Sequence, residues 1–132
     1  MSGTLNDQHQ RQVAPDLAIG TLVRPRTAEE LGDLLRECTA ASKSVLPFGG
    51  GGSIHTGRVV PGFDIGIDMR SLRGVIDYQP DDLTLSVRAG TTMSEIAAVL
   101  VEKGQELPID VPFPNVTTIG GLAATGFAGP RK

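Results

Sequence analysis

The chain contains four consecutive glycines, Gly49 to Gly52, inside the segment PFGGGGSIHTG at residues 47–57. Glycine has no β-carbon, so it adopts positive φ readily and lets backbone amides approach another group closely. Successive backbone N–H groups held in a concave turn bind anions such as phosphate. Because the apolar pair Val45 and Leu46 comes just before the glycines, the sequence predicts a short strand and then a loop whose backbone carries the chemistry.

Two well-known phosphate-binding motifs do not fit this loop. Gly52 and Gly57 match the first half of a P-loop, but Arg58 and Val59 stand where that motif needs Lys and then Ser or Thr. The fingerprint GxGxxG fails because His55 stands where the third glycine belongs. We interpret His55 as a polar loop residue. By composition alone, a flexible surface loop is the simpler interpretation of the glycines.

A second glycine motif, TTIGG at residues 117–121, opens a Gly- and Ala-rich stretch through Ala124. Thr118 is suited to cap a short helix there, and the first amides and positive dipole end of that helix would form another anion site. One diphosphate-containing cofactor explains two such sites on one small domain more simply than two idle loops. We therefore expect the bends around Gly50 and Gly120 to converge on the same pair of phosphates.

Composition excludes several other classes of function. The 132 residues suit one domain or part of one. A net charge of -3 without a basic stripe argues against nucleic-acid binding. The only cysteine, Cys38, cannot form an internal disulfide or a cysteine-based metal site, so no metal is expected. No apolar run is long enough to cross a bilayer, and a cytoplasmic location is the default expectation.

Periodicity and capping residues predict the order of the elements. Short strands are expected at 22–23, 45–46, 65–69, 75–78 and 83–87, the fourth pairing between its two neighbours. Helices are expected after two capping boxes, formed by Thr27 with Glu30 and by Thr92 with Glu95, and Gly104 is placed to end the second helix. The apolar face of the first helix is expected to hold Leu31, Leu34, Leu35 and Cys38, which places the cysteine in the core. This order indicates an α+β fold rather than a doubly wound parallel sheet.

The loop at 47–53, the strand and glycine at 83–90 and the motif at 117–122 resemble, in order and spacing, one known family. It is the FAD-binding domain of the vanillyl-alcohol oxidase type, also called the PCMH type. Residues 104–108 (GQELP) and 128–131 (AGPR) make the chain similar to the glycolate oxidase E-subunit branch of that family. The resemblance covers residues 22–132.

The resemblance implies the N-terminal portion of a PCMH-type FAD-binding domain, with small mixed sheets flanked by helices. Residues 1–20 would be a polar tail, and residues 21–132 the domain, truncated at its C-terminal end. FAD is expected to be non-covalent, because Gly52 stands where covalently linked members carry His; Phe48 stands where members often have Arg, which removes one charge contact. The cofactor-binding residues implied are Pro47, Phe48, Gly49, Gly50, Gly51, Gly52, Ser53, Ile54, Pro112, Thr117, Thr118, Ile119, Gly120 and Gly121.

The function implied is flavin-mediated oxidation of a 2-hydroxy acid such as glycolate. Substrate-facing residues usually come from a later cap domain in this family, so no catalytic residue is named and the isolated chain is expected to be inactive. The implied partners are other glycolate oxidase subunits, including a flavin subunit and an iron-sulfur subunit, which would hold the protein in the cytoplasm or at the inner face of the membrane.

Two alternatives remain open at this point. In the first, the chain is a non-catalytic assembly module of a glycolate oxidase type complex. In the second, it is a plain α+β fragment whose glycines are structural. A sheet without closing strands is also expected to expose apolar surface and unpaired edges, so the isolated chain is expected to be only marginally stable.

Overall fold

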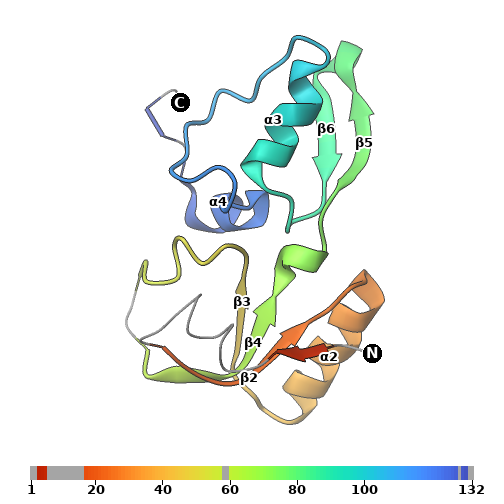
Figure 1. Ribbon diagram of the computed structural model, residues 1–132. Helices are drawn as coiled ribbons and strands as arrows, with labels where there is room; N and C mark the ends of the chain where they lie inside the picture. The colour runs from red at the N-terminus through yellow and green to blue at the C-terminus, as the bar shows by residue number, and fades with distance from the viewer. Residues whose placement is uncertain (1–2, 6–16, 58–59, 128, 131–132) are drawn as a thin grey trace.

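The computed structural model of the chain describes residues 3–5, 17–57, 60–127 and 129–130. In Figure 1 a lower half holds strands β1 (Gly3–Leu5), β2 (Ala18–Arg24), β3 (Val45–Phe48) and β4 (Gly62–Asp68) with helix α2 (Ala28–Ala40). An upper half holds β5 (Val75–Gln79), β6 (Thr84–Val87) and helix α3 (Met93–Val101), with α4 (Ile119–Thr125) facing the lower half. Two 3-10 turns, η1 (Met69–Ser71) and η2 (Pro80–Asp82), complete the described elements. Two small sheets with flanking helices match the expected α+β class.

The lower sheet has the strand order β1-β2-β4-β3. Strands β2, β4 and β3 are parallel, whereas β1 runs antiparallel to β2. The central strand β4 is buried from Ile65 to Asp68, because neighbours cover both of its faces, as is usual for parallel strands. Strand β1 and the first residues of β2 lie inside the 1–20 segment that was expected to be a polar tail, so the sheet begins before residue 21.

Two apolar clusters hold the lower sheet. On one side Ile19, Leu22 and Phe48 pack together. On the other side Cys38 of α2 packs against Ile65 and Ile67. Burial of each such aliphatic or aromatic side chain contributes about 1.5–3 kcal/mol. The predicted burial of the cysteine is confirmed, with 4% of the residue exposed.

The apolar face of α2 is narrower than expected. Leu31 and Leu34 pack against the cluster of Cys38, but Leu35 is 40% exposed. Successive helical residues are rotated by about 100°, so Leu35 falls at the edge of the face that Leu34 already occupies. The expectation that Leu35 lies in the core is wrong.

The helix caps follow the sequence closely. The hydroxyl of Thr27 accepts the amide of Glu30 at 3.1 Å, and Thr92 and Glu95 form the complete reciprocal capping box. At the far end of α3, Gly104 has φ +66°. Its amide donates to Val101 and the next amide, of Gln105, donates to Leu100, each at 3.0 Å. This is the Schellman pattern, so the predicted stop at Gly104 is confirmed.

The upper sheet differs from the expectation in its pairing. Within the described residues β5 pairs with β6 alone, in an antiparallel ribbon, and does not join β4. Strand β4 ends at Asp68, and η1 turns the chain away before β5 begins. Leu83, expected in a strand, is a left-handed residue with φ +55° and is 78% exposed. The alternation of inward-facing side chains begins two residues later, at Leu85. Leu85 and Val87 pack against the apolar cluster that includes Ile96 and Leu100 of α3.

Large apolar side chains are exposed on several parts of the chain. Ile76 on β5, Val101 on α3 and Phe113 in the following loop are 64%, 70% and 77% exposed. A two-stranded ribbon gains little stability alone. The marginal stability expected of the isolated chain stays a prediction.

The chain leaves the lower half after β4, whose last residue, Asp68, carries a buried carboxylate. The residue is 0% exposed, and its side chain accepts Nε of Arg24 at 2.9 Å together with Nε and Nη2 of Arg70 at 2.9 and 2.8 Å. Burial acts to raise the pKa of Asp68, but the hydrogen bonds from Arg70 and Arg24 outweigh it and hold the pKa below its usual value.

Close backbone packing completes this junction. The amide of Gly90 donates to the carbonyl of Leu72 at 2.8 Å, and a β-carbon on Gly90 would overlap the carbonyl oxygen of Met69. The buried hydroxyl of Thr91 accepts the amide of Gly74 at 2.9 Å. The segment after β6 therefore lies directly against the turn that follows β4.

Substitution Thr92→Ala should lower the free energy of unfolding by about 1 kcal/mol, because the first amides of α3 lose their side-chain acceptor. Urea denaturation would measure the change. The control is Thr39→Ala on α2, whose hydroxyl bonds within its own helix and whose loss should cost less than about 0.5 kcal/mol. Equal losses in the two variants would contradict the assignment of the cap.

Substitution Asp68→Asn should destabilise the fold by about 3–5 kcal/mol, because two arginines lose their buried counter-charge. The stabilisation is present at pH values above the unfolded pKa of Asp, about 3.9, and is lost as the pH falls through the lower folded pKa. The free energy of unfolding, measured from pH 7 down to pH 2, should therefore decrease less in the variant than in the native chain. Parallel pH profiles would show that Asp68 is not the group responsible.

Candidate cofactor-binding site

The two glycine motifs lie against each other in the fold. A β-carbon on Gly49 would overlap the hydroxyl of Thr118 and lie 2.8 Å from its Cγ2. A β-carbon on Gly50 would overlap the carbonyl oxygen of Val116 and lie 2.8 Å from its carbonyl carbon. In Figure 1 the loop after β3 accordingly runs beneath α4. The two motifs are therefore in direct contact, and the contact requires glycine at positions 49 and 50.

The start of α3 holds the second motif in place. The amide of Met93 donates to the carbonyl of Thr117 at 2.9 Å, and the backbones of Thr92 and Thr118 form an isolated antiparallel β-bridge. The hydroxyl of Thr117 donates to the carbonyl of Pro112 at 2.7 Å, which closes the preceding turn. Thr118 is 3% exposed, so the side of the site it forms is fixed by buried contacts.

The first loop offers unused donors. Within the part of the chain that the structure describes, the amides of Gly50, Gly51, Gly52 and Ser53 donate to no protein acceptor. The amide of Ile54 is used in a turn to the carbonyl of Gly51 at 3.2 Å. Gly51 has φ +79°, whereas a β-carbon on Gly52 would meet nothing within 4 Å. The free amides therefore lie in one short, partly exposed bend, which is the arrangement that binds an anion.

The second motif does not offer free amides, and the expectation that it would is wrong. The amide of Ile119 donates to Thr91 and that of Gly120 donates to Ala89, both at 2.9 Å. The amide of Gly121 donates to the capping hydroxyl of Thr118 at 3.3 Å. The segment after β6 lies across this helix end and occupies the donors. The second motif is therefore a rigid wall of the site and not a second anion cradle.

Apolar side chains anchor both ends of the first loop. Phe48 is 7% exposed and packs with Ile19 and Leu22, and Ile54 packs against the same cluster. Pro47 on β3 and Pro112 are exposed, and His55 is an exposed residue beyond the turn. The structure brings Gly49 and Gly50 against Thr118 and Val116, and the cofactor contacts of the other sequence-predicted residues stay predictions.

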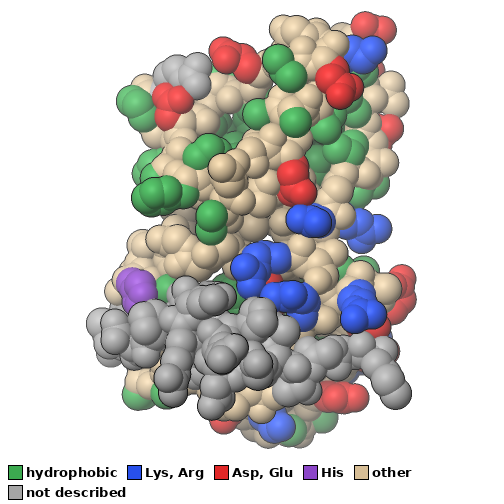
Figure 2. Space-filling model, in the orientation of Figure 1, with side chains coloured by type: hydrophobic (Ala, Val, Ile, Leu, Met, Phe, Trp, Pro, Cys, Tyr) green, Lys and Arg blue, Asp and Glu red, His purple; other side chains and the backbone are tan. Residues whose placement is uncertain are grey.

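Positive charge reaches the site from residues that the sequence analysis did not single out. Phe48 is paired with Asp68 across the β3–β4 ladder, and Asp68 holds Arg24 and Arg70. The hydrogen bond to Asp68 raises the pKa of Arg70 further above its ordinary value. Figure 2 shows Lys and Arg side chains gathered between the two halves of the molecule. The only sequence signal was an aspartate and an arginine at the end of a predicted strand.

A surface hollow of about 510 Å³ lies at the opposite edge of the lower sheet, where β2 and β4 begin. Its lining includes Ser44 and Asp64, which bond each other at 2.7 Å. A carboxylate at this edge disfavours a phosphate ligand, and the glycine bends lie at the other ends of the strands. The hollow is therefore not the candidate site.

Other kinds of site receive no support from the described residues. No group of three or more His, Cys, Asp or Glu side chains in them is arranged to hold a metal ion. None of the described helices has both the length and the apolar character to cross a membrane.

Comparison with known proteins agrees with this arrangement. Residues 20–132 match the family model described as FAD binding domain. The chain is 38% identical over 103 residues to the glycolate oxidase subunit GlcE of Escherichia coli, covering 75% of this chain and 29% of that protein. It is 31% identical over 124 residues to the mitochondrial D-lactate dehydrogenase [cytochrome] of Arabidopsis thaliana, covering 94% and 21%.

Solved structures share the fold. An alkyldihydroxyacetonephosphate synthase superposes with a TM-score of 0.71 at 28% identity, over 83% of this chain and 22% of that one. Aclacinomycin oxidoreductase superposes with a TM-score of 0.75 at 23% identity, over 98% and 27%. The chain thus spans less than a third of the length of these relatives. The glycine bends, the mixed sheets and the match over residues 20–132 together show that the chain belongs to the PCMH-type FAD binding domain family of FAD-linked oxidoreductases.

Proposed function

We propose that this chain holds FAD non-covalently through the bend at residues 48–53 and serves the oxidation of a 2-hydroxy acid. The observation that carries the proposal is the contact of Gly49 and Gly50 with Thr118 and Val116. That contact brings the two glycine motifs together. Among the described residues, the amides of the first bend, from Gly50 to Ser53, have no protein acceptor.

The residues present fit the diphosphate of FAD. Four successive amides without protein acceptors, from Gly50 to Ser53, match the many acceptor oxygens of a diphosphate. The open space at Gly52 lets a ligand approach the backbone. When bound, the flavin supplies the redox chemistry, and this chain binds and orients it.

Non-covalent attachment is supported by the side chains around the bend. Gly52 has no side chain with which to form a bond, and His55 is exposed three residues further on. A flavin released by acid precipitation of the protein would agree with this proposal, and a flavin that stays with the pellet would contradict it.

The 2-hydroxy acid is supported by the relatives' names. They include a glycolate oxidase subunit, a D-lactate dehydrogenase and D-2-hydroxyglutarate dehydrogenases. We propose glycolate as the first substrate to test, in a glycolate oxidase type complex with other subunits, cytoplasmic or at the inner face of the membrane. No catalytic residue is assigned within this chain, and the isolated chain is proposed to be inactive.

The FAD site is tested by two glycine variants that differ in what they disturb. Gly49→Ala should destabilise the fold by about 1–3 kcal/mol, because its methyl group overlaps Thr118. Gly52→Ala should unfold like the native chain but bind FAD at least about tenfold more weakly, because its methyl group lies where the diphosphate approaches, and tenfold corresponds to about 1.4 kcal/mol. Flavin fluorescence titration would measure the affinity.

The matched control is Gly32→Ala on the exposed side of α2, where a β-carbon meets only Arg36 Nη2 at 3.6 Å. It should raise helix stability by up to about 1 kcal/mol and leave the FAD affinity unchanged. Native FAD affinity in Gly52→Ala would count against the placement of the diphosphate.

The substrate is tested with the full protein and its partner subunits under anaerobic conditions. Glycolate should bleach the visible flavin band, because a flavin loses that absorbance on reduction. If glycolate, D-lactate and D-2-hydroxyglutarate all leave the band unchanged while FAD stays bound, the result counts against the oxidative role and favours the assembly module.

A further inference from the structure

The proposed diphosphate-binding bend contains no strong cation. Residues 47–57 include neither Lys nor Arg, so the bend itself provides only neutral backbone donors. A diphosphate carries negative charge, and hydrogen bonds from a charged donor are about twice as strong as those from a neutral one. The fold would have to supply a cation from another segment.

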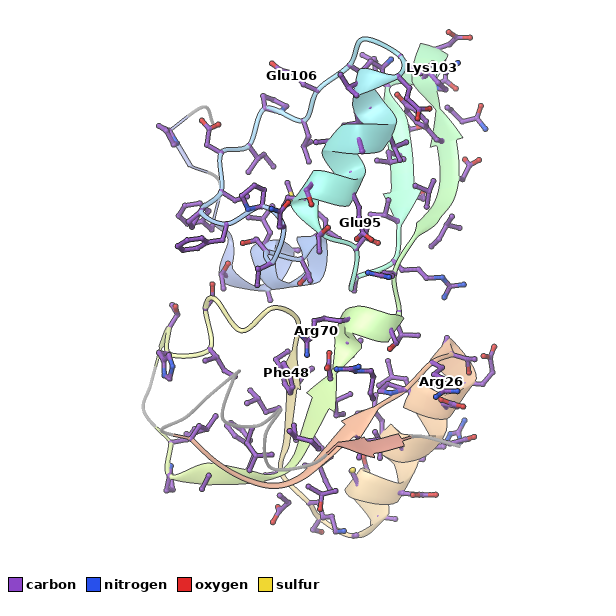
Figure 3. All side chains as sticks on the ribbon, in the orientation of Figure 1. Arg26, Phe48, Arg70, Glu95, Lys103 and Glu106 are labelled. Carbon is purple, nitrogen blue, oxygen red and sulfur yellow. The ribbon has the colours of Figure 1, made fainter. Side chains whose placement is uncertain are left out.

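Arg70 is the cation that the fold places at this edge. Asp68 is paired with Phe48, the residue just before the glycines, and Arg70 bonds Asp68 through both its backbone amide and its guanidinium. In Figure 3 Arg70 lies near Phe48, between the end of β4 and the helix α4 above it.

The charge count at Asp68 leaves an excess of positive charge. One arginine is enough to neutralise one carboxylate, but both Arg24 and Arg70 bond it. Arginine stays protonated in proteins, so the three side chains together carry a charge of about +1. Both arginines help to offset the burial of Asp68, and the positive charge that remains is available to a ligand.

The guanidinium groups also keep donors in reserve. Each uses Nε and Nη2 on Asp68, and within the described chain Nη1 of neither group has a protein acceptor. The side chain of Arg70 is 39% exposed and that of Arg24 is 30% exposed. Asp68 thus fixes the orientation of Arg70 while one edge of its guanidinium stays accessible.

We propose that Arg70, oriented by Asp68, donates to a phosphate of the cofactor diphosphate and supplies the positive charge that the glycine bend lacks. Arg24 shares the carboxylate and keeps the local charge positive. This inference rests on the proposed FAD site and adds a specific residue from outside the glycine motifs.

The test measures FAD and riboflavin affinities of the full chain by fluorescence titration. Arg70→Gln should weaken FAD binding by about tenfold to a hundredfold, the loss expected for a hydrogen bond to a charged group, and should leave riboflavin binding unchanged because riboflavin has no phosphate. Added salt should weaken FAD binding less in this variant than in the native chain. Arg70→Lys keeps the charge and should lose less affinity than Arg70→Gln.

The matched control is Arg36→Gln on α2, an exposed arginine that pairs with Asp33. It should leave the affinity for FAD and its salt dependence at native values. Equal FAD affinity and equal salt dependence in Arg70→Gln and the native chain would overturn the inference and leave the FAD site standing. A native chain that binds no FAD would instead overturn the proposed function, and this inference with it.

A second measurement needs no variant and so does not depend on folding of a mutant. Phenylglyoxal modifies accessible arginines, and mass spectrometry locates the modified residue. FAD and ADP should protect Arg70 from modification, whereas riboflavin should not. Modification of Arg70 at the same rate with and without saturating FAD would overturn the proposal.

Discussion

The two halves of this domain are held together by backbone pressed against backbone. At Gly50 the neighbouring group is the carbonyl of Val116, and at Gly90 it is the carbonyl of Met69. Gly120 shows a similar contact within the upper half, since a β-carbon there would lie 2.8 Å from the carbonyl oxygen of Ala89. A backbone oxygen is the nearest neighbour at each glycine, although Cγ1 of Val116 and Cβ of Ala89 also lie close, so main-chain geometry dominates the distance between the halves at Gly50 and Gly90. The placement of the free amides at residues 50–53 depends on that distance.

Electrostatics act at the same place. Asp68 is buried at the end of β4, where an unpaired carboxylate would be costly, and two arginines from different segments offset that cost. The result is a fixed positive edge beside a bend of neutral donors. A ligand with negative charge suits such an edge.

Local patterns in the sequence predicted local structure well. The caps at Thr27 and Thr92 and the burial of Cys38 each depend on residues within one helix or its immediate neighbours, and the structure confirms them. The errors come from contacts distant in the sequence. The amide of Gly120 is occupied by Ala89, and Arg24 reaches Asp68 from 44 residues away. Spacing within a motif carries no information about which other segment will lie across it.

The sequence predicted where the two glycine bends lie, but not which distant segment packs across each of them. The glycines marked both bends because their need for close approach is visible in residue type alone. The segment at residues 89–91 occupies the amides of the second bend and leaves those of the first bend free. The sequence TTIGG by itself does not predict that contact. Leu35 and Leu83 show the corresponding limit for packing, since each has the right residue type and the wrong orientation.

The glycine contacts also determine how this domain tolerates mutational drift. A clash with a side chain is often relieved when that side chain takes another rotamer, but a carbonyl oxygen within a hydrogen-bonded segment has no such escape. Compensating second substitutions are therefore scarce at Gly50, Gly90 and Gly120. We expect substitutions on the faces lined by side chains to be tolerated better than substitutions at these glycines.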